Sequence, residues 1–224
     1  MAIVAKFISP KNADKKIRIN IAEQEDGKKG FPAFLNEVIN DKTLPGHRVH
    51  LYLNEHAGQK WFTVSGPLRK TNEQGEFIII PRKNKDGALV DDKGQVVTEE
   101  SKAGRSFEYI KDREDQIVYG TLGTLNIQNL KADKTPTKQT LVSFYSIPDS
   151  KALEIERTVF ALTSSKKVQN PNPEQISFYE KQLNEQRKGA GSYSNMFITE
   201  GKDFLTKLGF EVRLDEKEST PTPN

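Results

Sequence analysis

The fold class is decided by residues 49–80, which read VHLYLNEHAGQKWFTVSGPLRKTNEQGEFIII. Val49, Leu51 and Leu53 alternate with polar or amphipathic residues, the period of two that is typical of a strand with one buried face. Two further runs, rich in aromatic and β-branched residues, follow after turn-forming segments, and a proline ends the last one. The stretch therefore predicts a β-meander with strands at 49–53, 61–64 and 77–80.

Strand-like runs recur at short intervals through most of the chain before residue 165. Alternating apolar residues predict further strands at 2–8, 17–21, 106–110, 116–127 and 140–147. Residues 32–39 predict one short helix from their apolar spacing, whereas 155–163 fit a strand or a short helix. No internal repeat is evident. Many strands with few helices favour a barrel or sandwich, and we expect a mainly β, OB-like Greek-key barrel with long loop insertions.

The barrel domain is expected to occupy residues 1–165 and to carry an inserted arm. Two turn signals, Asp86-Gly87 and Lys93-Gly94, lie in the irregular section 81–106 and predict a small exposed hairpin that projects from the sheet. Long loops of this kind in compact domains are usually functional or disordered.

A helical extension is expected over residues 166–214, which makes the chain α+β overall. Asn172 is a good N-cap with Pro173 as first helical residue, so a helix should begin there. A second helix is expected at 202–208 and a short strand at 210–213. The polar tail 215–224 is predicted to be disordered.

Composition limits the classes of function. The 224 residues include 34 Lys and Arg, 31 Asp and Glu, and no cysteine, which excludes disulfides, thiolate zinc sites and cysteine nucleophiles. Residues 1–70 hold 12 basic and 7 acidic residues, so positive charge is concentrated in the first third. Neither a signal-peptide core nor a run of about 18 apolar residues is found. We expect a soluble, cytoplasmic protein that does not bind a membrane.

Catalytic and metal chemistry find little support. The three histidines, His47, His50 and His56, lie within ten residues, but their spacing covers a strand and a turn, so we interpret them as sheet-surface or solvated side chains. Acidic pairs such as Asp91-Asp92 sit in turns, where adjacent carboxylates point apart. No phosphate-binding glycine loop or nucleophile elbow is present. We therefore expect no enzyme, no cofactor and no metal.

Aromatic and basic residues provide the better signal. Trp61 is the only tryptophan, and Tyr52 lies on the outward side of its strand if Leu51 and Leu53 face inward. Single-stranded nucleic acid is bound by rings under the bases and cations along the backbone, although a core Trp61 is the alternative interpretation. The predicted binding residues are Lys16, Arg18, Arg48, Tyr52, Lys60, Trp61, Arg69, Lys70, Arg82 and Lys83.

The run 59–66 (QKWFTVSG), followed by 75–80 (GEFIII), resembles the central strands of OB-fold single-stranded-DNA-binding proteins, such as those of phages and mobile elements. The resemblance covers about thirty residues and implies DNA binding in replication. The bacterial members of that family end in an acidic tail with a terminal Pro-Phe that recruits partner proteins. This sequence ends in TPTPN, so recruitment by that route is not expected.

Together these features predict a non-catalytic single-stranded-DNA-binding protein with a basic, aromatic barrel face. The expected partner is single-stranded nucleic acid, with DNA favoured over RNA. The C-terminal helices would pack on the barrel or serve homo-oligomer formation. The alternative is a β-rich phage structural or assembly protein in which the 81–106 arm makes subunit contacts.

Overall fold

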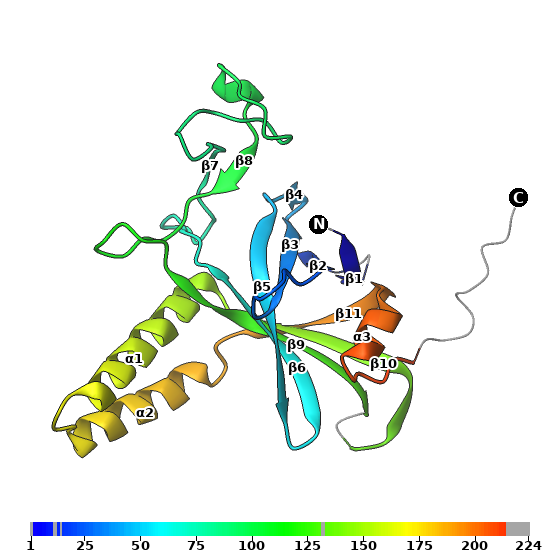
Figure 1. Cartoon of the computed structure of the whole chain (residues 1–224), viewed down its shortest axis with the longest axis vertical. Helices are drawn as coiled ribbons and strands as arrows, with labels where there is room; N and C mark the ends of the chain where they lie inside the picture. The colour runs from blue at the N-terminus through cyan, green and yellow to red at the C-terminus, as the bar shows by residue number, and fades with distance from the viewer. Residues whose placement is uncertain (1, 11–12, 14, 131–132, 214–224) are drawn as a thin grey trace, which may run out of the picture.

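Eight antiparallel strands close into a barrel in the computed structural model, which describes residues 2–10, 13, 15–130 and 133–213 (Figure 1). The short strand β4 (Lys42–Thr43) pairs with β3 beside the barrel. The barrel strands are β1 (Ile3–Ile8), β2 (Lys15–Ala22), β3 (Phe31–Ile39), β5 (His47–His56), β6 (Gln59–Pro67), β9 (Tyr119–Leu130), β10 (Pro136–Ser146) and β11 (Ser192–Glu200).

The strands alternate between the barrel interior and the outer surface. In β2, Ile17, Ile19 and Ile21 are buried, whereas the intervening Lys16 and Arg18 are exposed. The same alternation in the other strands fills the interior with large apolar side chains, as in other small closed barrels. The largest fully buried ones from the barrel strands are Phe7, Ile19, Ile21, Leu51, Phe62, Leu125 and Phe144.

The mainly β, OB-like barrel class with long insertions and later helices is confirmed. The Greek-key order is the part that the topology corrects. Around the barrel each strand pairs with its neighbour in the chain, and β1 closes the ring by pairing with β11. This meander arises because tight turns, such as Ala57-Gly58 between β5 and β6, favour pairing of consecutive strands.

Two local predictions are settled by pairing and packing. Residues 32–39 form strand β3 and not a helix, because both edges of this segment pair, with β2 on one side and β5 on the other. Ala33 and Leu35 then face the core. Residues 155–163 lie within helix α1 (Asp149–Lys167).

The inserted arm spans residues 68–118, between β6 and β9, and is larger than the predicted 81–106. It contains β7 (Ile79–Pro81), the 3₁₀ helix η1 (Glu100–Lys102) and β8 (Arg105–Phe107), and it projects from the barrel (Figure 1). The run 77–80 therefore belongs to the arm, where Ile79 pairs with Phe107. Strand β9 takes the expected place of that run beside β6.

One turn is built four times in the arm, a repeat that the sequence analysis missed. In each copy, an Asn or Asp Oδ1 accepts hydrogen bonds of 2.8–3.0 Å from the backbone N–H groups two and four residues later. The residue three positions on has positive φ and is glycine in three copies. Such locally satisfied turns need little core. The four turns begin at Asn72, Asn84, Asp91 and Asp112.

The helices correct the predicted domain boundary at 165. α1 and α2 (Pro173–Arg187) form a pair that is inserted between β10 and β11, and the chain then returns to the barrel. Asn172 caps α2 as expected, accepting from the backbone N–H groups of Glu174 and Gln175. No helix in the described ranges is long and apolar enough to cross a bilayer.

The end of the described chain covers one end of the barrel. In α3 (Lys202–Lys207), Leu205 is buried and Phe204 packs edge-to-face on Phe31. Phe210 packs against Phe62. Residues 210–213 form no strand, although the Arg213 carbonyl accepts a hydrogen bond from the Thr140 backbone. The predicted disordered tail, 215–224, lies outside the described residues.

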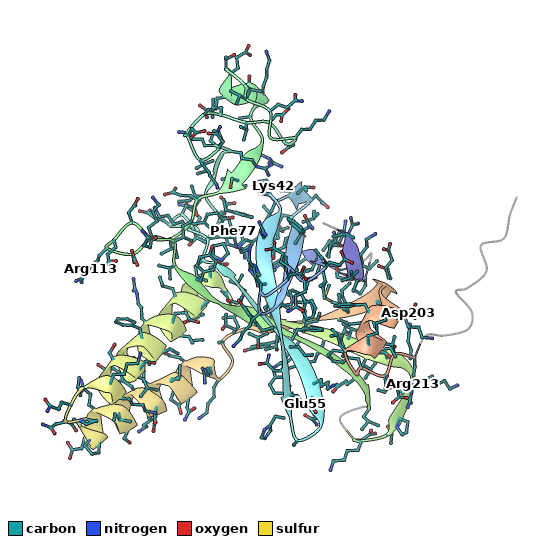
Figure 2. The ribbon with its side chains drawn as sticks, viewed as in Figure 1. Lys42, Glu55, Phe77, Arg113, Asp203 and Arg213 are labelled. Carbon is teal, nitrogen blue, oxygen red and sulfur yellow. The ribbon has the colours of Figure 1, made fainter. Side chains whose placement is uncertain are left out.

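Arg69 joins the barrel, the arm and the helices. Its side chain is only 5% exposed and donates to Asp149 Oδ1 at the start of α1 (2.8 Å) and to Glu37 Oε2 on β3 (2.5 Å). Its guanidinium lies 4.0 Å from the ring centre of Phe77 and 5.1 Å from that of Phe107, both in the arm. Figure 2 shows Phe77 where the arm leaves the barrel.

Lys15 completes this buried ion cluster by contacting Glu37 Oε1 at 2.6 Å. Burial alone raises the pKa of Glu37, but the charges of Arg69 and Lys15 outweigh it and leave the pKa below its ordinary value. The carboxylate is therefore held ionised in the interior.

Replacing Arg69 by Met should destabilise the fold by about 3–5 kcal/mol, because Glu37 and Asp149 would keep buried charges without their main partner. Urea unfolding followed by circular dichroism measures this loss. Lys166→Ala removes the half-exposed pair with Glu180 and is the matched control, with an expected cost of at most about 1 kcal/mol. Equal effects of the two substitutions would contradict the assigned role of Arg69.

Candidate nucleic-acid interface

Trp61 lies on the outside of the barrel. Its neighbours Phe62 and Val64 in β6 are differently placed, since Phe62 fills the core while Trp61 alternates with it and is only partly buried. The register places Trp61 between Asn54 of β5 and Asn126 of β9. The core interpretation of Trp61 is therefore excluded.

The strand register extends this position into a wider surface, which we call the aromatic face. One row across five strands consists of Tyr52, Thr63, Thr124, Tyr145 and Tyr193, and the adjacent row consists of Asn54, Trp61, Asn126, Ser143 and Asn195. Four spacings between neighbouring strands make each row roughly 19 Å long. The ten side chains include four aromatic rings and carry no charge.

Several of these rings are accessible yet held in place. Tyr193 is 72% and Tyr52 39% exposed. The rings of Tyr145 and Tyr193 have centres 4.8 Å apart, and the Tyr145 hydroxyl accepts a 2.6 Å hydrogen bond from the Gly191 backbone. The Tyr52 ring packs over Gly30, where an added Cβ would lie 2.8 Å from Tyr52 Cε1. These contacts pre-organise flat apolar surfaces at the protein exterior.

Hydrogen-bonding groups lie between the rings. Asn54 Nδ2 donates to Thr63 Oγ1 at 3.0 Å and to the Tyr52 carbonyl at 2.8 Å, which leaves its Oδ1 on the surface. Asn126 Nδ2 donates to Thr124 Oγ1 at 3.4 Å. Amides and hydroxyls of this kind offer both donors and acceptors to a ligand.

Lys60 points away from the aromatic face, contrary to its predicted role beside Trp61. Adjacent residues of a strand face opposite sides. The Lys60 ammonium donates to the Leu208 carbonyl at the end of α3 (3.0 Å) and lies 3.6 Å from Glu55. It caps the last turn of α3, where a cation complements the free carbonyls.

Arg69 is the clearest correction among the predicted binding residues, because its guanidinium is buried in the ion cluster. Lys70 pairs with Glu108. Arg82 and Lys83 lie in the arm, where Arg82 donates to the Arg105 carbonyl. The arm holds 10 basic and 11 acidic residues, so it provides no cationic path for a phosphate backbone.

The other predicted cations, Lys16, Arg18 and Arg48, do lie together. All three are exposed on the outer surface of β2 and β5, with β3 between these strands. Phe34 of β3 is 36% exposed among them. We call Lys16, Arg18, Phe34 and Arg48 the basic face. The predicted site thus divides into an aromatic face, a basic face and residues with structural roles.

The aromatic residues that the sequence analysis missed are Tyr145 and Tyr193. Strand β11 was not assigned, because Gly189–Ser192 indicated a break and the alternation of Ser194, Met196 and Ile198 is only weakly apolar. Its register with β10 is what places Tyr193 beside Tyr145.

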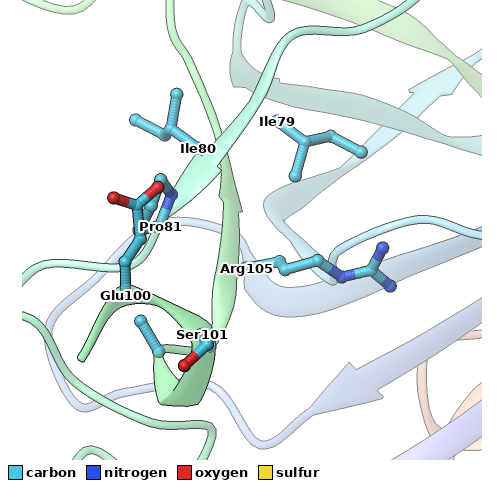
Figure 3. Close-up of a pocket in the computed structure, with 8 residues that line it drawn as sticks. Ile79, Ile80, Pro81, Glu100, Ser101 and Arg105 are labelled. Atoms are coloured by element: carbon cyan, nitrogen blue, oxygen red, sulfur yellow. The ribbon is translucent and has the colours of Figure 1, made fainter. Parts of the chain in front are cut away.

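Figure 3 shows a pocket of about 400 Å³ at the base of η1 in the arm. Ile79, Ile80 and Pro81 supply an apolar wall. Glu100 and Arg105 also line the pocket but point in different directions, and the Arg105 guanidinium donates to the Thr43 carbonyl on β4. This lining offers a small apolar surface and no paired acid and base.

The three histidines occupy different environments. His47 is fully buried, His50 is half-buried on the outer surface, and His56 is exposed at the β5–β6 turn. His47 Nε2 donates to the Pro67 carbonyl at 3.0 Å, whereas its Nδ1 is buried without a partner among the described residues. Burial, reinforced by the Arg69 charge, lowers the pKa of His47 to about 4 although Asp149 and Glu37 oppose the shift.

Neutral His47 should make stability fall in mild acid. The unfolded chain takes up a proton near pH 6.5 and the folded protein only near pH 4, so stability is lost as the pH falls through this window. The slope should approach about 1.4 kcal/mol per pH unit. Urea titrations at several pH values measure the slope, which should be smaller in His47→Gln and unchanged in the exposed control His56→Gln. An unchanged slope in His47→Gln would contradict this assignment.

Comparisons with protein-family models, with curated proteins and with solved structures found no match to this chain.

Proposed function

We propose that this protein binds single-stranded DNA, without catalysis, through the aromatic face. The observation that carries the proposal is the alignment of Tyr52, Trp61, Tyr145 and Tyr193 on the outside of five neighbouring strands. Exposed rings of this kind are stacking platforms for bases, each worth about 1–3 kcal/mol. The basic residues of the adjacent basic face supply attraction for phosphates.

The chemistry of the face favours contacts with bases over contacts with phosphates. No carboxylate or cation occurs at its ten positions, and its amides and hydroxyls match the donors and acceptors of base edges. A strand would lie with its bases on the sheet and its phosphates toward solvent and the basic face. Part of the affinity then comes from stacking, which persists at salt concentrations that weaken phosphate contacts.

Single strands are preferred in this arrangement because only unpaired bases can stack on side-chain rings. In a duplex, the base faces are covered by neighbouring pairs, so a duplex would meet this surface only through its backbone. DNA is favoured over RNA by the resemblance of residues 59–80 to single-stranded-DNA-binding proteins.

Trp61 reports directly on this proposal, since it is the only tryptophan. Titration with oligothymidine should quench its emission saturably, and duplex with the same number of phosphates should quench it less. Tyr193→Ala should weaken binding by about 1–3 kcal/mol through loss of one stacking platform. Fluorescence titration measures both effects at fixed salt.

Phe160→Ala is the matched control, because Phe160 is 75% exposed on α1 and lies outside the aromatic face. This variant should bind as the unchanged protein does. Absence of oligonucleotide binding even at low salt would overturn the proposed function, as would equal losses in Tyr193→Ala and Phe160→Ala.

A second candidate function, assembly of a β-rich structure, is favoured by the helical pair. Phe160 and Phe178 are 75% and 62% exposed on α1 and α2, which project from the barrel (Figure 1). Large exposed rings on a projecting element are typical of contacts between proteins.

If these rings mediate assembly, light scattering should show a mass above that of the single chain of 25.3 kDa, and Phe160→Ser with Phe178→Ser should restore the monomer. The double variant should keep its oligonucleotide affinity, because the aromatic face is unchanged. A monomeric unmodified protein at high concentration would exclude self-assembly through these helices.

A further inference from the structure

The basic face contains an exposed aromatic ring whose position core packing does not explain. In β3, Ala33 and Leu35 are buried in the core, while Phe34 between them faces outward and is 36% exposed. A phenyl ring in this position contributes little to the barrel interior. Its surroundings show what it is suited to contact.

Phe34 lies among cations and an amide. The register puts Arg48 of β5 directly opposite on one side and Asn20 of β2 opposite on the other. Arg18 is two residues from Asn20 and exposed on the same surface. A ring with guanidinium groups on two sides can stack one base while the flanking phosphates contact the cations.

The charges of this patch are available to a ligand. Arg48 is 3.4 Å from Glu25, but both side chains are partly exposed and Glu25 contacts Lys28 more closely, at 2.5 Å. Surface pairs of this kind are weak and a phosphate can replace them. The carboxylate of β3, Glu37, points inward to Arg69 and Lys15 and does not neutralise the outer surface.

The basic face is also continuous with the aromatic face. Arg48 and Tyr52 are both exposed on β5, four residues apart, which corresponds to roughly 13 Å along the strand. The closed barrel has no sheet edge between β3 and β6 that would interrupt the surface.

From these observations we infer that the basic face is a second nucleotide subsite, in which Phe34 stacks a base and Arg18 and Arg48 hold the adjacent phosphates. This inference rests on the proposed function. A strand that fills the aromatic face continues across β5 to β3 and β2. Short oligonucleotides occupy the aromatic face alone, and only longer ones reach Phe34.

Oligothymidines of two lengths test the subsite, one of about 5 and one of about 16 nucleotides, within the usual site size of a barrel domain. Phe34→Ala should weaken binding of the long strand about tenfold and leave the short strand unchanged. Arg18→Gln with Arg48→Gln should do the same and should lower the salt slope for the long strand by about 1.4, or 0.7 for each phosphate lost. Phe34→Tyr, which keeps an aromatic ring, should retain the affinity.

Lys151→Gln with Lys166→Gln is the matched control, because it removes two exposed cations of α1 and should alter neither affinity nor slope. Melting curves establish that each variant is folded. Unchanged binding of the long strand by Phe34→Ala and by the double arginine variant would overturn the subsite and leave the proposed function standing. Equal losses for both lengths would also overturn it. Failure of the unmodified protein to bind either strand would overturn the subsite and the proposed function together.

Discussion

The ion cluster around Arg69 is the constraint on which the arrangement of the molecule depends. A buried guanidinium must be paired and hydrogen-bonded, because a single charge in the interior is very costly. Asp149 and Glu37 meet this need from α1 and β3, and the rings of Phe77 and Phe107 cover it from the arm. One residue at the end of β6 therefore determines where both long insertions leave the barrel.

The two insertions lie away from the aromatic face because of this anchoring. The arm starts after β6 and is held together by four local turns, and the helical pair starts after β10 at Asp149. The outer surfaces of β5, β6, β9, β10 and β11 retain exposed rings and amides. The barrel thus acts as a rigid support whose strand register aligns side chains that are far apart in the sequence, a common way to build a binding surface.

The sequence analysis predicted the barrel class, the strands at 49–53 and 61–64, the α2 helix with its Asn172 cap, and the α3 helix. These elements follow from local periodicity and capping, which a short window contains. It was wrong for 32–39, because apolar spacing there fits a helix while pairing on both edges imposes a strand. It also placed 77–80 in the barrel, since periodicity cannot tell which strand lies beside β6.

For the candidate site, the sequence alone determined which residue types are present and that Trp61 and Tyr52 face outward, because alternation with buried neighbours defines the facing of a strand residue. Only the tertiary structure decided which side chains share a surface. Register between β9, β10 and β11 brought Tyr145 and Tyr193 into line with Trp61 and Tyr52, and burial removed Arg69 from the binding set. The physical reason is that strand pairing and charge burial join residues distant in sequence, and no local pattern records which partners meet.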